Sequence, residues 1–112
     1  MVKVTFEEKD NKLTLKLEGH AGQASKGQDI VCSSCSILAY TVAQLVTNAK
    51  GMGELKSIPE IKLEAGEGCI SCEPSEESYT ALKSAYLFAE VGYILLAHNY
   101  PRYVELKQFD TE

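Results

Sequence analysis

The sequence predicts an α+β fold in which two helices cover one mostly antiparallel sheet, with elements in the order ββαββαβ. Two segments near the N-terminus alternate apolar and polar residues, and two long segments carry apolar residues every three or four positions. Glycine- and proline-containing stretches separate these segments. Because the chain has 112 residues, a single domain over residues 1–112 is expected, burying roughly two-thirds of its unfolded surface.

The N-terminal segment predicts a β-hairpin. Apolar residues occupy positions 2, 4 and 6, and leucines occupy positions 13, 15 and 17, each alternating with polar residues. Such alternation is typical of half-buried antiparallel strands. Residues 9–11, Lys-Asp-Asn, supply the turn between them.

A long helix is expected over about residues 30–50, after a loop of small residues at 20–28. Asp29 stands where an N-cap should stand, and Gly51 and Gly53 end the helix. Its apolar residues recur at spacings of three and four: Val31, Cys35, Leu38, Val42, Leu45, Val46 and Ala49.

The C-terminal half is expected to add two strands, a second helix and a last strand. The two strands lie near residues 60–65 and 69–73, and the last strand over residues 103–109. Pro74 and Ser75 open the helix, which has glutamates in its first turn, where the helix dipole favours them. The helix stops before Pro101.

Composition limits the expected location and partners. No apolar run approaches the ~20 residues that cross a bilayer, and the N-terminus is typical of a strand rather than a signal peptide. A cytoplasmic protein without membrane association is therefore expected, with its four cysteines reduced. The net charge of −5 argues against direct nucleic-acid binding and favours a basic peptide or protein as partner.

The loop and the start of the long helix predict a cysteine nucleophile with a histidine base. Cys32 falls in the expected first turn, where unpaired N–H groups and the helix dipole favour a thiolate. His20, twelve residues upstream, ends the preceding strand, and the loop could bring its imidazole beside the sulfur. Gly22 and Gly27 lie within the loop, as hinges of a substrate gate would.

Each of these residues also has a structural interpretation. A cysteine at a helix start is more often a small buried residue, and His20 could simply bond to backbone. Asp29 could be an N-cap alone, and Ser36, one turn after Cys32, could be an ordinary helix serine.

The cysteine spacing leaves two further interpretations open. Cys32-x-x-Cys35 and Cys69-x-x-Cys72 are spaced like the ligands of a structural zinc site, or like the motif of a thiol–disulfide exchange protein. Cys69 and Cys72 should nevertheless point to opposite faces of a strand, and no metal is expected.

Gly-His-Ala at 19–21, Gly-x-Asp-Ile-Val-Cys at 27–32 and Ser36 together resemble the signature of the ribosomal-processing cysteine proteases, the Prp family. The N-terminal hairpin, the long helix and residues 92–104 resemble the family as well. Residues 33–35, Ser-Ser-Cys, replace the more usual Ala-Ala-Val and add a thiol.

The resemblance implies a bacterial, largely homodimeric endopeptidase that needs no cofactor. Its members remove a short N-terminal extension from the large-subunit ribosomal protein numbered twenty-seven, cutting after a pair of aromatic residues. By resemblance, His20 and Cys32 are the catalytic pair, and Asp29 and Ser36 are the supporting residues.

Overall fold

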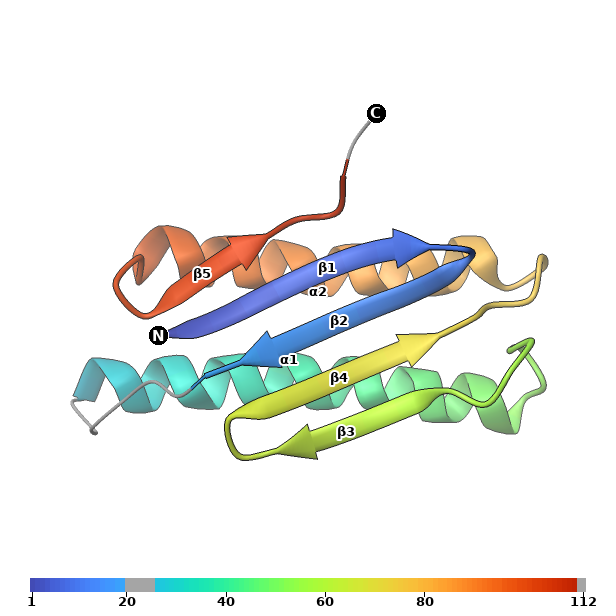
Figure 1. Ribbon diagram of the computed structural model, residues 1–112, viewed down its shortest axis with the longest axis horizontal. Helices are drawn as coiled ribbons and strands as arrows, with labels where there is room; N and C mark the ends of the chain where they lie inside the picture. Colours follow the sequence, from blue (N-terminus) through green and yellow to red (C-terminus); the bar gives the residue numbers. More distant parts are fainter. Residues whose placement is uncertain (20–25, 111–112) are drawn as a thin grey trace.

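The computed structural model describes residues 1–19 and 26–110, with the backbone alone for residues 26–29, and shows one sheet with two helices on the same face (Figure 1). The predicted fold class and element order are confirmed. The elements are β1 (Val2–Lys9), β2 (Lys12–Glu18), α1 (Lys26–Gly51), β3 (Glu60–Glu64), β4 (Glu67–Cys72), α2 (Tyr79–Asn99) and β5 (Val104–Lys107).

The sheet has the strand order β3-β4-β2-β1-β5. All neighbouring strands are antiparallel except β1 and β5, which run parallel. The predicted first hairpin is present, and its two turn residues, Asp10 and Asn11, have φ of 53° and 66°. Positive φ at both positions is what a two-residue type I′ turn requires, and Asn and Asp tolerate it better than most residues.

The core lies between the sheet and the two helices. Phe6, Tyr86 and Tyr93 are among its largest fully buried side chains. Each tyrosine hydroxyl finds a backbone acceptor: Tyr86 donates to the Ile70 carbonyl at 3.0 Å and Tyr93 to the Cys35 carbonyl at 2.8 Å. Burying these hydroxyls without partners would cost several kcal/mol, so the two bonds allow tyrosine to fill the core.

Helix α1 begins at Lys26, four residues before the expected start. Gly27 therefore lies in the helix rather than in a loop, and Asp29 lies within the first turn rather than at the N-cap. Cys32 consequently lies in the second turn. Apolar periodicity marks only turns that pack on the sheet, so a polar first turn leaves no such signal in the sequence.

The start of α2 also differs from the prediction. Helix α2 begins at Tyr79 and has no acidic residue in its first turn. Pro74 pairs with Leu55 in an isolated antiparallel bridge, and the Ser75 N–H donates to the Glu54 carbonyl at 2.8 Å. These contacts hold residues 74 and 75 outside the helix.

The last strand is shorter than the sequence indicates, because β5 ends at Lys107. Two residues later, the Phe109 N–H donates to the Glu90 carboxylate of α2 at 2.8 Å. The Phe109 ring packs on Phe6, with centroids 5.3 Å apart. The segment after β5 thus leaves the strand to pack against the core.

Both helices carry more apolar side chains than their packing against the sheet buries. Residues Ile30–Gly51 and Tyr79–Asn99 are long and apolar enough, by length and composition, to cross a bilayer, with mean hydropathies of 1.6 and 1.2. The expectation that no apolar run approaches this length is therefore wrong. Part of the excess lies on an outward surface of α2, the apolar helix face, formed by Phe88, Val91 and Leu95, which are spaced three and four residues apart and are all more than half exposed.

Candidate active site

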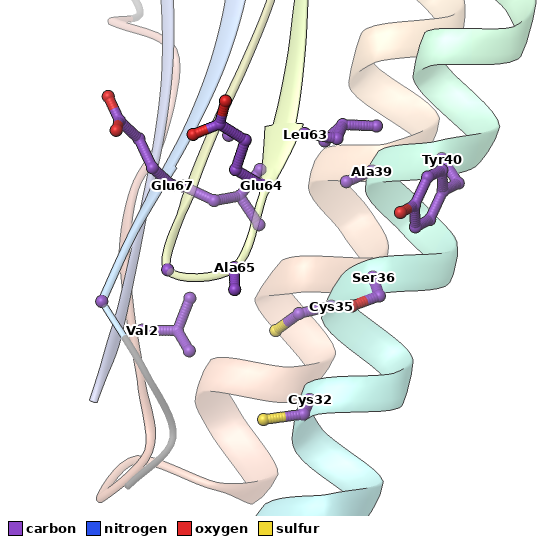
Figure 2. A pocket seen from close by; sticks show the side chains of 14 residues that line it. Val2, Cys32, Cys35, Ser36, Ala39, Tyr40, Leu63, Glu64, Ala65 and Glu67 are labelled. Carbon is purple, nitrogen blue, oxygen red and sulfur yellow. The ribbon is translucent and has the colours of Figure 1, made fainter.

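A pocket of about 330 Å³ opens between α1 and the turn that joins β3 to β4 (Figure 2). The ends of β1 and β2 complete its wall. Its lining residues are Val2, Leu17, Gly19, Cys32, Cys35, Ser36, Ala39, Tyr40, Leu63, Glu64, Ala65, Gly66, Glu67 and Gly68.

Cys32 lines this pocket from α1 with an exposed thiol, and Figure 2 shows its sulfur on the pocket side of the helix. The unpaired N–H groups of an α-helix belong to its first four residues, which here are residues 26–29. The expected position of Cys32 in the first turn is therefore wrong. Its accessibility beside a pocket is nevertheless what a nucleophile requires.

His20 and Gly22 lie outside the described residues, so the predicted base and the first gate glycine remain predictions. Gly19, the residue before His20, does line the pocket. Its N–H donates to the Gly66 carbonyl at 2.9 Å, which ties the end of β2 to the β3–β4 turn. Strand β2 therefore delivers the chain to the pocket immediately before His20.

Gly19 has a backbone conformation that favours glycine. Its φ is 99°, and a Cβ at this position would overlap the backbone carbonyl oxygen of Met1. The sequence contains this residue in the Gly-His-Ala run, but only the fold shows why a side chain does not fit there.

Of the supporting residues, Ser36 lines the pocket one turn beyond Cys32 and is exposed. The backbone of Asp29 forms part of the first turn of α1, and its side chain is not among those that the structure describes. Gly27 belongs to the same turn. The structure thus brings Cys32 and Ser36 together and leaves the roles of Asp29 and Gly27 as predictions.

Cys35 supplies a second sulfur to the pocket wall (Figure 2). The predicted packing role is confirmed, because only 4% of the residue is exposed. Burial, and secondarily the neighbouring Cys32, raise the pKa of the Cys35 thiol to about 11. Cys35 is therefore protonated near neutral pH, whereas nucleophilic attack needs a thiolate.

The other cysteine pair lies on β4, away from the pocket. Alternation along the strand buries Cys72 in the core and places Cys69 on the opposite face, as predicted. Burial raises the pKa of both thiols. Two thiols on opposite faces cannot converge on one tetrahedral zinc ion. Among the side chains that the structure describes, in residues 1–19 and 30–110, no group of three or more His, Cys, Asp or Glu is placed to hold a metal.

The β3–β4 turn and the strand ends beside it contribute pocket residues that sequence analysis missed. Leu63 and Ala65 add apolar surface, whereas Glu64 and Glu67 line the pocket with carboxylates that point away from α1 (Figure 2). These residues are more than 30 positions from Cys32 along the chain. No local pattern could have assigned them to the site, because the pairing of β4 with β2 brings the turn there.

The family comparison covers almost the whole chain. The family model for cysteine protease Prp matches residues 1–105. The ribosomal processing cysteine protease Prp of Mycoplasma pneumoniae is 31% identical over 108 residues, which span 96% of this chain and 94% of that protein.

Solved structures share the fold. A Streptococcus mutans protein superposes with a TM-score of 0.67 at 23% identity, over 99% of this chain and 96% of its own. The essential ribosomal processing protease Prp of Staphylococcus aureus, in complex with a substrate peptide, has a TM-score of 0.67 at 19% identity, over 96% of this chain and 99% of its own. With an accessible cysteine in a pocket and a family match across residues 1–105, this chain belongs to the Prp family of cysteine proteases.

Proposed function

We propose that this protease acts in ribosomal processing, removing the N-terminal extension of the large-subunit ribosomal protein numbered twenty-seven by cutting after an aromatic pair. The observation that carries the proposal is the shared pocket of Cys32 and Gly19, because Gly19 directly precedes His20. The names of the Mycoplasma pneumoniae and Staphylococcus aureus relatives, both ribosomal processing proteases, support the substrate class.

In the proposed reaction, the Cys32 thiolate attacks the scissile carbonyl, and His20 as imidazolium protonates the leaving amine. Water then hydrolyses the thioester with His20 as general base. Ser36, one turn beyond Cys32 on the pocket wall, and Asp29 are proposed to support the pair. No step needs a cofactor.

The pocket chemistry supports a substrate with aromatic residues before the cut and basic residues after it. Leu17, Ala39 and Leu63 offer apolar wall on which aromatic rings gain free energy by burial. Glu64 and Glu67 line the same pocket, and the protein carries a net charge of −5. Such charges mainly accelerate encounter with a basic partner.

Mass spectrometry of a synthetic peptide tests the proposed substrate. A peptide with two phenylalanines before the scissile bond and lysines after it should be cut once, directly after the phenylalanines. Replacing both phenylalanines by alanine should lower kcat/KM by at least about 100-fold, because two buried rings are worth several kcal/mol. Replacing the lysines by glutamine should cost about fivefold or less per charge.

Two variants make the test specific. Cys32→Ala and His20→Ala should each abolish cleavage, while Cys69→Ala, on the other face of the sheet, should leave it nearly unchanged. If the alanine peptide were cut normally while the charge-neutral peptide failed, the proposed aromatic site would be wrong.

We further propose that the protein is a cytoplasmic homodimer that contacts neither membrane nor nucleic acid directly. The apolar helix face supports a protein–protein contact, since Phe88 is 82% exposed and Val91 and Leu95 are each more than half exposed. With 16 acidic against 11 basic residues, the chain has little to attract phosphates.

Light scattering after size-exclusion chromatography tests the oligomeric state. The wild-type protein should elute at twice its 12.3 kDa chain mass, and the double variant Phe88→Ser with Val91→Ser should elute as a monomer. Binding of the wild-type protein to neutral lipid vesicles, with no dimer in solution, would contradict the proposal.

A further inference from the structure

The pocket holds two thiols of unequal exposure on one helix. Cys32 is exposed and Cys35 is 4% exposed, and both line the same cavity. Figure 2 shows both sulfurs on the pocket side of α1. The other two cysteines lie on β4 and are not among the pocket residues. Any oxidation chemistry that begins at Cys32 therefore meets Cys35 first.

The spacing of the pair permits a disulfide after a small backbone movement. Residues i and i+3 of an ideal α-helix have Cα atoms about 5 Å apart, within the range that disulfides span. Their Cβ atoms are about 5–6 Å apart, whereas a disulfide needs about 4 Å. Closing the bond therefore requires α1 to distort by about 1–2 Å locally, and a strained disulfide is readily reduced.

The neighbourhood determines which end of the pair moves. The Tyr93 hydroxyl donates to the Cys35 carbonyl at 2.8 Å, and Tyr93 is fully buried. Cys35 is therefore fixed to α2, while Cys32 lies one turn closer to the start of α1. Helix ends open more easily than helix centres, so the movement falls on the Cys32 side.

We propose that Cys35 is the resolving thiol of Cys32, forming a reversible disulfide that protects the nucleophile from overoxidation by hydroperoxides. The inference rests on the proposed function in one respect: Cys32 has to be the reactive thiolate.

The chemistry proceeds in two steps. The Cys32 thiolate attacks a peroxide oxygen, so that an S–O bond forms, the O–O bond breaks and hydroxide or alkoxide leaves. Cys32 is thereby oxidised by two electrons to a sulfenic acid and the peroxide is reduced. Cys35, having lost its proton, attacks the Cys32 sulfur; the S–S bond forms, the S–O bond breaks and water leaves. A dithiol later reduces the disulfide.

The burial of Cys35 sets the speed of the second step. Because its pKa is raised to about 11, only a small fraction is thiolate at neutral pH. The rate of closure should therefore rise about tenfold per pH unit until the pH approaches that value.

Intact-mass spectrometry of the full chain after treatment with hydrogen peroxide tests the inference. The wild-type protein should lose about 2 Da, and peptide mapping should find Cys32 linked to Cys35. Its cleavage activity should be lost and should return with dithiothreitol. In Cys35→Ala, Cys32 should instead gain about 32 Da as a sulfinic acid, and activity should not return.

Cys72→Ala is the matched control, because Cys72 is buried to a similar extent, at 2% exposed, but lies outside the pocket; it should behave as the wild type. Cys35→Val, which keeps a side chain of similar size in the core, serves if Cys35→Ala is unstable. The inference is overturned if Cys32 of the wild type is oxidised to sulfinic acid without forming a disulfide with Cys35. It is also overturned if Cys35→Ala regains its cleavage activity with dithiothreitol as fully as the wild type does. Cleavage by Cys32→Ala would overturn the nucleophile assignment. Peptide mapping detects the Cys32–Cys35 disulfide without any cleavage assay, so a failure of the inference and a failure of the proposed function can be told apart.

Discussion

Cys32 and Cys35 are three residues apart on α1, yet one thiol is exposed and the other is 4% exposed. The same contrast separates Cys69 from Cys72 on β4, where alternation buries only the second. Environment therefore distinguishes four chemically identical side chains. An accessible thiol beside a pocket can meet a peptide, whereas a buried one contributes packing.

Alanine substitutions at the four cysteines should separate these roles. Cys32→Ala should abolish peptide cleavage and leave the free energy of unfolding nearly unchanged, since its side chain is exposed. Cys35→Ala should lower that free energy by about 1–2 kcal/mol through lost packing, while retaining cleavage. Urea unfolding and kcat/KM measure the two effects, and cleavage retained by Cys32→Ala would end the nucleophile assignment.

Among the elements, the end of β2 has a special position, because it joins the sheet to the pocket. The Gly19 N–H bonds to the Gly66 carbonyl at 2.9 Å, so one backbone contact connects β2 to the β3–β4 turn. The positive φ of Gly19 and the close approach of Met1 exclude any side chain at this point. Strain introduced there would shift the chain that leads into His20.

Gly19→Ala should therefore lower the free energy of unfolding by about 2 kcal/mol or more and lower kcat/KM as well, because both the φ and the space disfavour a Cβ. Gly53→Ala is a matched control: its φ is 72°, but nothing lies within 4 Å of the added Cβ. The control should lose about 1 kcal/mol and keep full activity. Equal stability and activity in the two variants would show that the Met1 contact is unimportant.

At the scale of the whole molecule, one polar cluster joins β1, α2 and the C-terminal segment. Glu8 accepts hydrogen bonds from Lys83 at 2.6 Å and from Tyr79 at 2.7 Å. The Lys83 ammonium also lies 3.7 Å from the centroid of the Phe109 ring. Partial burial of Glu8 opposes its ionisation, but the bonds from Lys83 and Tyr79 outweigh it and lower the pKa of Glu8 below 4.5.

This cluster should make the free energy of unfolding depend on pH in the acid range. A carboxyl whose pKa is lowered by folding stabilises the protein above its unfolded pKa, and that stabilisation is lost as the pH falls through the lowered value. Glu8→Gln should therefore lose less stability than the wild type between pH 7 and pH 3 in urea unfolding. Glu7→Gln is the control, because the exposed pair of Glu7 with Lys16, at 3.8 Å, contributes little. Identical acid sensitivity in wild type and Glu8→Gln would contradict the assignment.

The sequence by itself determined the fold class, the element order and the identity of the exposed candidate nucleophile. Alternation at positions 2–6 and 13–17 and the periodicity of α1 and α2 are local signals, because burial on one face repeats with the period of the element. The start of α1 was misplaced because a polar first turn leaves no such signal. The start of α2 was misplaced because Pro74 and Ser75 are held outside the helix by contacts with Leu55 and Glu54, which are distant in the sequence.

Only the tertiary structure decided what surrounds Cys32. Pairing of β4 with β2 brings Leu63, Glu64 and Glu67 to a pocket whose α1 residues lie more than 20 positions away along the chain. The packing of α1 on the sheet likewise buries Cys35 and leaves Cys32 open. Contacts between residues distant in sequence depend on how sheet and helices pack, and no periodicity within one segment encodes that packing.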